Sequence, residues 1–372
     1  MKIKPMTKFA ILALSLVLVA CAGGGSEEAG CPAIDGREIN VVATTPMIGE
    51  FVSQVGGENI NLTVLMPPEA NPHTYEPAPQ DAGTIAEADL VFYTGLLYEP
   101  AALVKLLENS ACSTDILSEV GESVFPIEFK EGGHDDHDDH DDHDDHDDEK
   151  DHDDEEGHDD HDDEEGHDDE EGHDDEEGHD DHDDEEGHDD HEGHNHGAYD
   201  PHFWFDPSRV AYAAEYIESR LIQFDPENES SYKSSADSFV SELNDLTKQV
   251  SELISTVPSQ NRKLITTHES LGYLEAKFGL EVLSTIIPSL NSANEISPSD
   301  LAGVIDVIED NNVKVIFIES EAPSVYSETI VAETGIKPVT GLYVETLKPG
   351  QSYSEFLISN VKLITENLQD TD

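Results

Sequence analysis

Short apolar runs alternate with amphipathic stretches along most of this chain. β-Branched or aromatic runs bounded by polar residues predict strands, and apolar residues at intervals of three and four predict helices. The predicted strands cover residues 39–44, 60–66, 90–94, 264–266, 282–287, 313–318 and 339–343. The predicted helices cover residues 47–55, 80–88, 101–107, 207–224, 226–256, 271–278, 298–309 and 352–368. Strands and helices that alternate in this way indicate an α/β fold with two (β/α) lobes built on parallel sheets.

One predicted helix is longer than the others and divides the chain. Its apolar residues recur at helical spacing and form one packing face: Phe239, Leu243, Leu246, Val250, Leu253 and Ile254. We therefore predict an N-terminal lobe at residues 31–225, a linker helix at 226–257 and a C-terminal lobe at 258–372.

The first thirty residues predict where the protein works. Three lysines precede an apolar run, residues 9–20, that is shorter than the roughly 20 residues of a permanent membrane helix. The run ends in LVAC, which resembles a bacterial lipoprotein signal in which Cys21 is acylated. We expect a signal peptide at 1–20, a flexible lipid-anchored tether at 21–30, and an extracytoplasmic protein held to the cell membrane by its lipid. An ordinary secretory signal that is cut nearby is the alternative.

Two further cysteines remain, Cys31 and Cys112. An even pair in a disulfide-permissive compartment predicts a structural disulfide. Two cysteines this far apart do not resemble a zinc site.

Sixteen of the 19 histidines lie in one acidic repeat of HDD and HDDEEG units, residues 134–196. This tract has almost no apolar residue, so we expect it to be a disordered loop. Imidazoles interleaved with carboxylates offer many weak, exchangeable metal sites, and we assign the tract to accessory metal capture. The residues singled out for this role are His134, His137, His140, His143, His146, His194 and His196. A merely solvated acidic spacer is the alternative.

The charge of the chain excludes one class of partner. The formal net charge is −67, and both the tract and the remaining 309 residues are acidic. A nucleic-acid partner would require basic patches to neutralise its phosphates, so we predict none. We expect a monomer.

Only three histidines lie outside the tract: His73, His202 and His268. His73 and His268 follow predicted strands, and His202 lies where the tract returns to the fold. Ligands gather at the carboxyl ends of parallel strands, so a cleft between the lobes can bring these histidines together. Three neutral imidazoles that converge on one point make a tight site for a borderline metal such as zinc. Three unrelated surface or core histidines are the alternative.

Three motifs carry a resemblance to a known family. Residues 71–77 read NPHTYEP, residues 200–207 read DPHFWFDP, and residues 266–274 read TTHESLGYL. In this order, with a lipoprotein signal before them and a His/Asp-rich insertion between the first two, they resemble the cluster A-I substrate-binding lipoproteins of zinc and manganese ABC importers. The resemblance implies two lobes joined by a rigid backbone helix, with a metal ion in the cleft between them. It also implies delivery of that ion to the membrane permease of an ABC importer, without catalysis.

The resemblance implies His73, His202 and His268 as metal ligands. Manganese receptors of the family generally place a glutamate at the third position and zinc receptors a histidine, so His268 favours Zn²⁺, with Mn²⁺ as the alternative. The fourth position is an acidic residue near the C-terminus, where Glu345 falls. Zinc receptors often have Asp-Pro there and this chain has Glu-Thr, so the fourth ligand is Glu345 or a water. Glu319 also matches a family position, and we interpret it as a carboxylate that caps nearby backbone rather than as a ligand.

Three functions compete. The favoured one is a high-affinity zinc receptor that serves an ABC importer, with a manganese receptor of the same family as its variant. The second is a surface metal buffer or adhesin dominated by the tract. The third, a zinc hydrolase, is disfavoured because neither a HExxH motif nor an evident general base accompanies the histidines. We therefore predict that the protein is not an enzyme.

Overall fold

The computed structural model describes residues 31, 34, 36–129, 199–321 and 325–369. The predicted signal peptide, the lipidated Cys21 and the histidine tract lie outside the described residues. Among the helices that are described, none is both long enough and apolar enough to cross a membrane.

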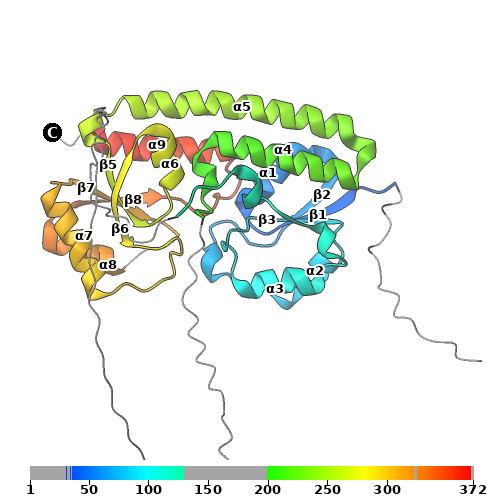
Figure 1. The fold of residues 1–372 in the computed structure, drawn as a ribbon, viewed down its shortest axis with the longest axis horizontal. Coiled ribbons are helices and arrows are strands. Elements are labelled where there is room, and N and C mark those ends of the chain that lie inside the picture. Colours follow the sequence, from blue (N-terminus) through cyan, green and yellow to red (C-terminus); the bar gives the residue numbers. More distant parts are fainter. Residues whose placement is uncertain (1–30, 32–33, 35, 130–198, 322–324, 370–372) are drawn as a thin grey trace, which may run out of the picture. The chain divides into compact units, whose positions relative to one another are not determined.

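The first lobe contains a four-stranded parallel sheet in the order β2-β1-β3-β4. Its strands are β1 (Ile39–Ala43), β2 (Ile60–Val64), β3 (Leu90–Tyr93) and β4 (Leu117–Glu119). Its helices are α1 (Pro46–Gly56), α2 (Pro79–Ala86), α3 (Ala101–Ser110) and α4 (Pro207–Phe224). Helices α1 and α4 cover one face of this sheet, and α2 and α3 cover the other (Figure 1).

The second lobe contains two pairs of parallel strands. These are β5 (Lys263–His268) with β6 (Glu281–Ile287), and β7 (Val315–Glu319) with β8 (Lys337–Leu342). Strand β5 also contacts β7, so the two pairs are neighbours. The helices of this lobe are α6 (Gly272–Phe278), α7 (Pro298–Asp310), α8 (Val325–Thr334) and α9 (Tyr353–Gln369). The structure thus has the α/β fold with two lobes and parallel sheets that the sequence predicts.

Helix α5 (Glu229–Ser255) runs along both lobes (Figure 1). It packs on α1 and α4 of the first lobe and on α9 of the second. Its buried residues recur every three or four positions: Tyr232, Ala236, Phe239, Leu243, Leu246, Val250 and Ile254. This stripe belongs to one apolar core that also includes Val41 of β1 and Phe317 of β7. Both lobes therefore share a continuous core, which opposes large hinge motions between them.

Two elements were not predicted from the pattern, β4 and α8. Strand β4 has three residues, too few to show an alternation. In α8 the apolar residues Val325, Ile330 and Val331 do not repeat along one face, so the helical period is lost.

The chain leaves the first lobe and re-enters it at one place. Glu128 and Tyr199 form an isolated antiparallel bridge, and the Asp200 N–H donates to the Ile127 carbonyl at 3.0 Å. These contacts hold together the two ends that flank residues 130–198.

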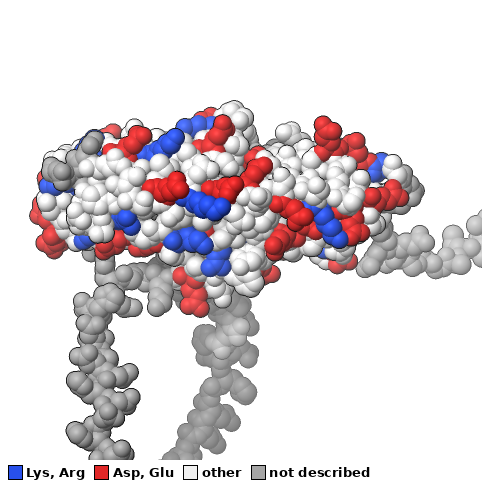
Figure 2. All heavy atoms as spheres, turned by 90° about the horizontal axis from the view of Figure 1, so that it is seen from above, with Lys and Arg blue, Asp and Glu red and all other residues white. Residues whose placement is uncertain are grey.

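Charge on the described surface is mixed. On the face drawn in Figure 2, Lys and Arg side chains lie singly or in small groups among Asp and Glu. The absence of a nucleic-acid partner stays a prediction from composition.

Candidate metal centre

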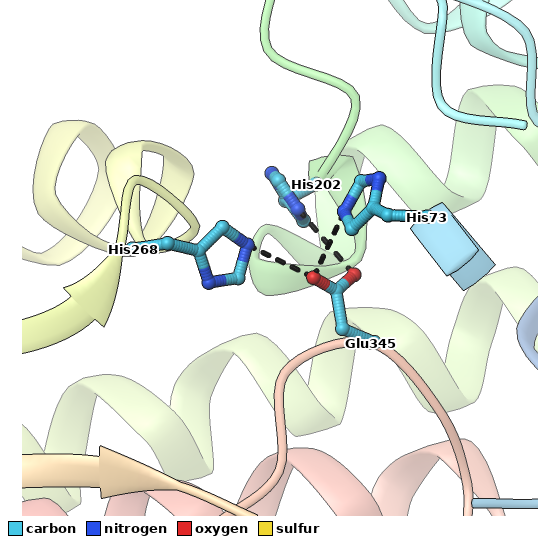
Figure 3. A group of neighbouring side chains, drawn as sticks. All are labelled: His73, His202, His268 and Glu345. Carbon is cyan, nitrogen blue, oxygen red and sulfur yellow. Dashed lines mark hydrogen bonds and ion pairs between the residues drawn. The ribbon is translucent and has the colours of Figure 1, made fainter. Parts of the chain in front are cut away.

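The structure brings together all four residues that the sequence proposes as metal ligands (Figure 3). His73 lies in a 3₁₀ turn, Pro72–Thr74, on the loop that follows β2. His202 immediately precedes the turn Phe203–Phe205. His268 is the last residue of β5, and Glu345 lies on the loop after β8. His73, His268 and Glu345 thus lie at the carboxyl ends of parallel strands, where such sheets gather ligands.

The four side chains converge on one point. One ligand atom from each residue lies within 4.8 Å of all the others. The Nε2 atoms of His73 and His268 lie 3.1 and 2.9 Å from Glu345 Oε1, and His202 Nε2 lies 3.5 Å from Glu345 Oε2. Two ligands of a tetrahedral zinc ion with bonds of about 2.0–2.1 Å are separated by about 3.3–3.4 Å. The observed N–O separations bracket that value.

Two of the histidines are oriented by a carboxylate behind the ring. His202 Nδ1 lies 2.8 Å from Asp200 Oδ1, and the same oxygen accepts the His202 backbone N–H. His268 Nδ1 lies 2.5 Å from Glu319 Oε2, while Glu319 Oε1 accepts the His268 backbone N–H at 3.1 Å. A carboxylate on Nδ1 fixes the tautomer and directs the Nε2 lone pair at the site. Both Nε2 atoms are buried, and within the described residues Glu345 is the only polar group that approaches them, at 3.5 Å from His202 and 2.9 Å from His268.

His73 is held differently. The Asn71 side chain accepts the His73 backbone N–H at 2.9 Å. The His73 ring packs edge-on against Tyr98 with ring centroids 5.1 Å apart. In the part of the chain that the structure describes, Glu345 is the only carboxylate bonded to this ring.

Tyr98 contacts Glu345 from the first lobe. Its buried hydroxyl donates to Glu345 Oε2 at 2.9 Å, and burial together with Glu345 raises the pKa of Tyr98 well above its usual value, so the hydroxyl keeps its proton. The turn that places Tyr98 requires Gly95, which has φ 77° and whose Cβ would lie 2.0 Å from the Glu119 carboxylate. Tyr98 thus binds Oε2 of Glu345, and Oε1 of Glu345 faces His73 and His268.

The charges of the site are strongly coupled. Burial lowers the pKa of His202, but Glu345 and Asp200 outweigh this and bring it to about 9. Burial likewise opposes a charge on His268, but Glu319 and Glu345 raise its pKa well above the usual value. Burial raises the pKa of Glu345, yet the three imidazoles outweigh it and hold this pKa well below its usual range. A metal ion that binds here must displace protons from imidazole.

The loop that carries Glu345 is fixed from both lobes. Trp204 Nε1 donates to the Val344 carbonyl at 2.8 Å, and Glu321 Oε1 accepts backbone N–H groups of the same loop. Burial, followed by the charge on Glu345, raises the pKa of Glu321 to about 8. Trp204 is fully buried with its neighbours Phe203 and Phe205, and its ring packs edge-on against His202.

Sequence reasoning missed several residues that act on the ligands. Asp200 had a local signal, because it precedes His202 by two positions in DPH. Tyr98 and Glu321 had none, since their contacts depend on loops far away in sequence. Glu319 caps the His268 backbone N–H, as the sequence interpretation has it, and also holds the ring.

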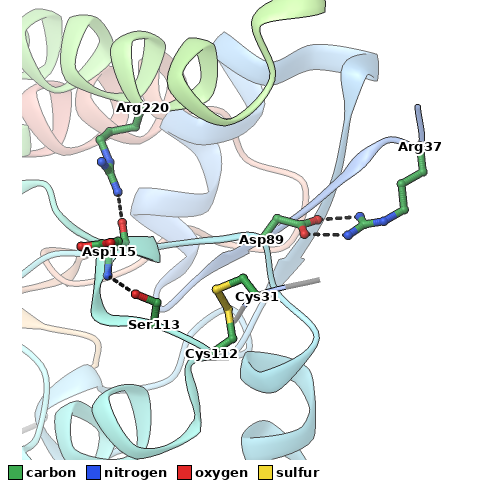
Figure 4. Close-up of a disulfide and its surroundings, with 7 residues drawn as sticks. All are labelled: Cys31, Arg37, Asp89, Cys112, Ser113, Asp115 and Arg220. Atoms are coloured by element: carbon green, nitrogen blue, oxygen red, sulfur yellow. Dashed lines mark hydrogen bonds and ion pairs between the residues drawn. A yellow bond between two sulfur atoms is a disulfide. The ribbon is translucent and has the colours of Figure 1, made fainter. Parts of the chain in front are cut away.

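The other predicted site residues lie elsewhere. Cys31 and Cys112 form a disulfide at the far side of the first lobe's strands, close to the bidentate pair of Arg37 with Asp89 (Figure 4). Cys21 and the accessory histidines, His134 to His196, lie outside the described residues.

With this geometry in place, comparison with known proteins identifies the family. The model of the family described as "ZnuA: Zinc-uptake complex component A periplasmic" matches residues 41–367. The chain belongs to this family. It is therefore a metal-binding receptor of an ABC importer, which works with a membrane permease on the extracytoplasmic side, and it is not an enzyme.

Relatives within the match carry the names of different metals. The high-affinity zinc uptake system protein ZnuA of Bacillus subtilis is 27% identical over 370 residues, covering 97% of this chain and 96% of that protein. The manganese ABC transporter substrate-binding lipoprotein PsaA of Streptococcus anginosus is 24% identical over 375 residues, covering 98% and 99%. Among solved structures, the periplasmic zinc-binding protein TroA of Treponema pallidum superposes with a TM-score of 0.66 at 19% identity, covering 89% of this chain and 99% of that one. This last likeness concerns the two-lobe fold.

Proposed function

We propose that this chain is the zinc receptor of an ABC importer. It binds one Zn²⁺ through His73, His202, His268 and Glu345 and delivers the ion to the permease. The observation that carries the proposal is the pair of buried Nε2 atoms of His202 and His268, which a carboxylate behind each ring directs at Glu345 and which make no hydrogen bond to any other described residue.

The donor set supports zinc over manganese. Three imidazoles and one carboxylate suit a four-coordinate borderline ion, whereas manganese prefers a larger share of oxygen donors. Tyr98 engages Glu345 Oε2, so Oε1 is the oxygen we assign to the metal. One oxygen and three nitrogens complete a tetrahedron.

The membrane anchor, the division into lobes, the role of the tract and the oligomeric state of this receptor are proposed from the sequence. Lipid on Cys21 anchors the chain after removal of the signal peptide at 1–20. Lobes at 31–225 and 258–372 hold the ion, joined by the linker segment 226–257. The tract at 134–196 collects metal near the site through many weak ligands, and the receptor acts as a monomer.

A manganese receptor is the second candidate. It is favoured by relatives such as the Streptococcus anginosus and Halalkalibacterium halodurans lipoproteins, whose names specify manganese. The histidine at position 268, which supplies nitrogen at the end of β5, favours zinc over this candidate.

A competitive titration tests the proposal. Zinc and manganese are titrated in parallel against a chelator of known affinity, using the soluble protein with and without residues 134–196, and each form with His268→Ala. We expect the form without the tract to bind one zinc ion tightly, to prefer zinc to manganese, and to lose that binding on substitution. Tighter binding of manganese would establish the second candidate. If the form without residues 134–196 has lost all tight binding, the protein is the metal buffer instead.

A further inference from the structure

Glu319 and Glu321 lie two positions apart where β7 ends. Strand β8 continues to pair past Glu319, because the Ser320 N–H donates to the Leu342 carbonyl at 2.8 Å. The chain bends at Ser320, which is exposed, so the places of the two carboxylates follow from their contacts. Glu319 binds the backbone and ring of His268, and Glu321 binds the backbone of the loop that carries Glu345.

Glu321 binds the backbone of the loop that carries Glu345. Its Oε1 accepts from the N–H groups of Val344, Glu345 and Thr346, at 3.0, 3.2 and 3.4 Å. Three successive amides that point at one oxygen define the path of the backbone through Glu345. The Val344 carbonyl, on the other side of the loop, accepts from Trp204 Nε1 at 2.8 Å.

Glu321 itself does not belong to the ligand group. The atoms that converge in the described residues come from His73, His202, His268 and Glu345. Glu321 Oε1 is occupied by the three amides, so its contact with the site passes through the backbone of Glu345.

We propose that Glu321 is a positioning residue for metal binding, which sets the backbone of Glu345 as Glu319 sets the ring of His268. The end of β7 thereby controls both ligands of the second lobe. This inference rests on the proposed metal site. Groups that orient a metal ligand typically change metal affinity by about 10–100-fold when removed.

Variants of the full-length protein test the role. Glu321→Ala and Glu321→Met remove the acceptor, whereas Glu321→Gln keeps a carbonyl oxygen at the same distance from the backbone. Glu333→Ala, at an exposed position of α8, removes one negative charge without touching the site. With one equivalent of zinc competed against a chelator, we expect Kd to rise about 10–100-fold for Ala and Met. We expect Gln to stay within about threefold of the unaltered protein and Glu333→Ala to match it.

Two further measurements separate positioning from loss of folding. Cobalt(II) bound to the Ala and Met variants should lose part of the intense visible absorption of a tetrahedral ion, and Gln should restore it. In the unaltered protein, the amides of residues 344–346 should be protected from hydrogen exchange, which requires no variant. Rapid exchange at those amides, or unchanged Kd and cobalt spectra in Ala and Met, overturns the inference.

The controls distinguish the two proposals. If the unaltered protein binds zinc tightly and His268→Ala does not, failure of the Glu321 variants to change Kd refutes only the positioning role. If the unaltered protein lacks tight binding, the proposed function and this inference fall together.

Discussion

In the second lobe both proposed ligands lie beside β7, whereas in the first lobe they lie on turns outside the sheet. Glu319 bonds the backbone and ring of His268, and Glu321 bonds the backbone of Glu345. His73 has Asn71 on its backbone and an aromatic contact on its ring. His202 of the first lobe is held as His268 is, by Asp200 on its backbone N–H and on its ring. The second lobe therefore has both of its ligands preorganised by carboxylates, whereas the first lobe has only His202 so held.

The difference indicates where the site can adapt. The shared core through α5 resists large motion between the lobes, so capture and release must involve the ligand loops. His73 lies on the loop between β2 and α2, and within the described residues Glu345 is the only polar group bonded to its ring. We infer that His73 is the ligand that moves first.

The largest expected effect is a loss of folding stability when the disulfide of the first lobe is removed. Its disulfide closes a segment of 81 residues, and the C-terminal lobe has no cysteine. Replacing both Cys31 and Cys112 with serine should lower the free energy of unfolding by about 2–4 kcal/mol. Because neither cysteine contacts the site, zinc Kd should stay unchanged. Chemical denaturation and zinc titration on the same sample check this, and a tenfold change in Kd would show that the disulfide also shapes the ligand loops.

Next in size is the contrast between the restraints on His268 and His73. Glu319→Gln leaves a single acceptor for two donors of His268, so zinc affinity should fall about 10–100-fold. Asn71→Ala removes two neutral hydrogen bonds, one from the His73 backbone N–H and one to Ser292 Oγ, and should weaken zinc by only about threefold to tenfold. Competitive zinc titrations of both variants show which substitution weakens zinc binding more. A larger effect at Asn71 would reverse the assignment of the preorganised half.

A change of pH, rather than a substitution, gives the last contrast, and it runs in opposite directions for folding and for binding. The pKa of His202 is raised to about 9, above the unfolded value of 6.5. This ion pair therefore stabilises the metal-free fold fully below about pH 6.5, and the contribution is lost as pH rises through 9. Zinc must displace at least this proton, so its affinity should fall by at least about tenfold per pH unit on going below pH 9. Melting curves without metal and titrations between pH 6 and 9 measure both slopes. Parallel slopes would contradict the role of Glu345 as the partner of His202.

Much of the fold could be predicted from hydrophobic periodicity, because long elements repeat their pattern many times. Helix α4 has the predicted bounds, 207–224, since Asp206 caps it and Pro207 begins it. Helix α5 begins at Glu229 rather than 226, because residues 226–228 form a 3₁₀ turn first. Strand β4 and helix α8 are stabilised by tertiary contacts that leave no period in the sequence.

The four converging residues could be proposed because histidine is rare outside the tract and each motif is recognisable. What could not be proposed is the support behind them. Tyr98 reaches Glu345 across 247 positions, and Glu321 reaches it across 24. Neither distance has a sequence signature, since both depend on how the loops after β3, β7 and β8 come together.

Glu128 and Tyr199 are joined by a bridge, and His202 lies three residues further on. The geometry of His202 is therefore independent of how many residues lie between the two bridge residues. A loop whose ends are already clamped loses only about 0.6 kcal/mol of closure entropy for each doubling of its length. Repeat units can therefore be gained or lost between these two residues with almost no change in melting temperature. The number of HDD units is free to vary among descendants of this gene while the residues that hold the ion stay in register.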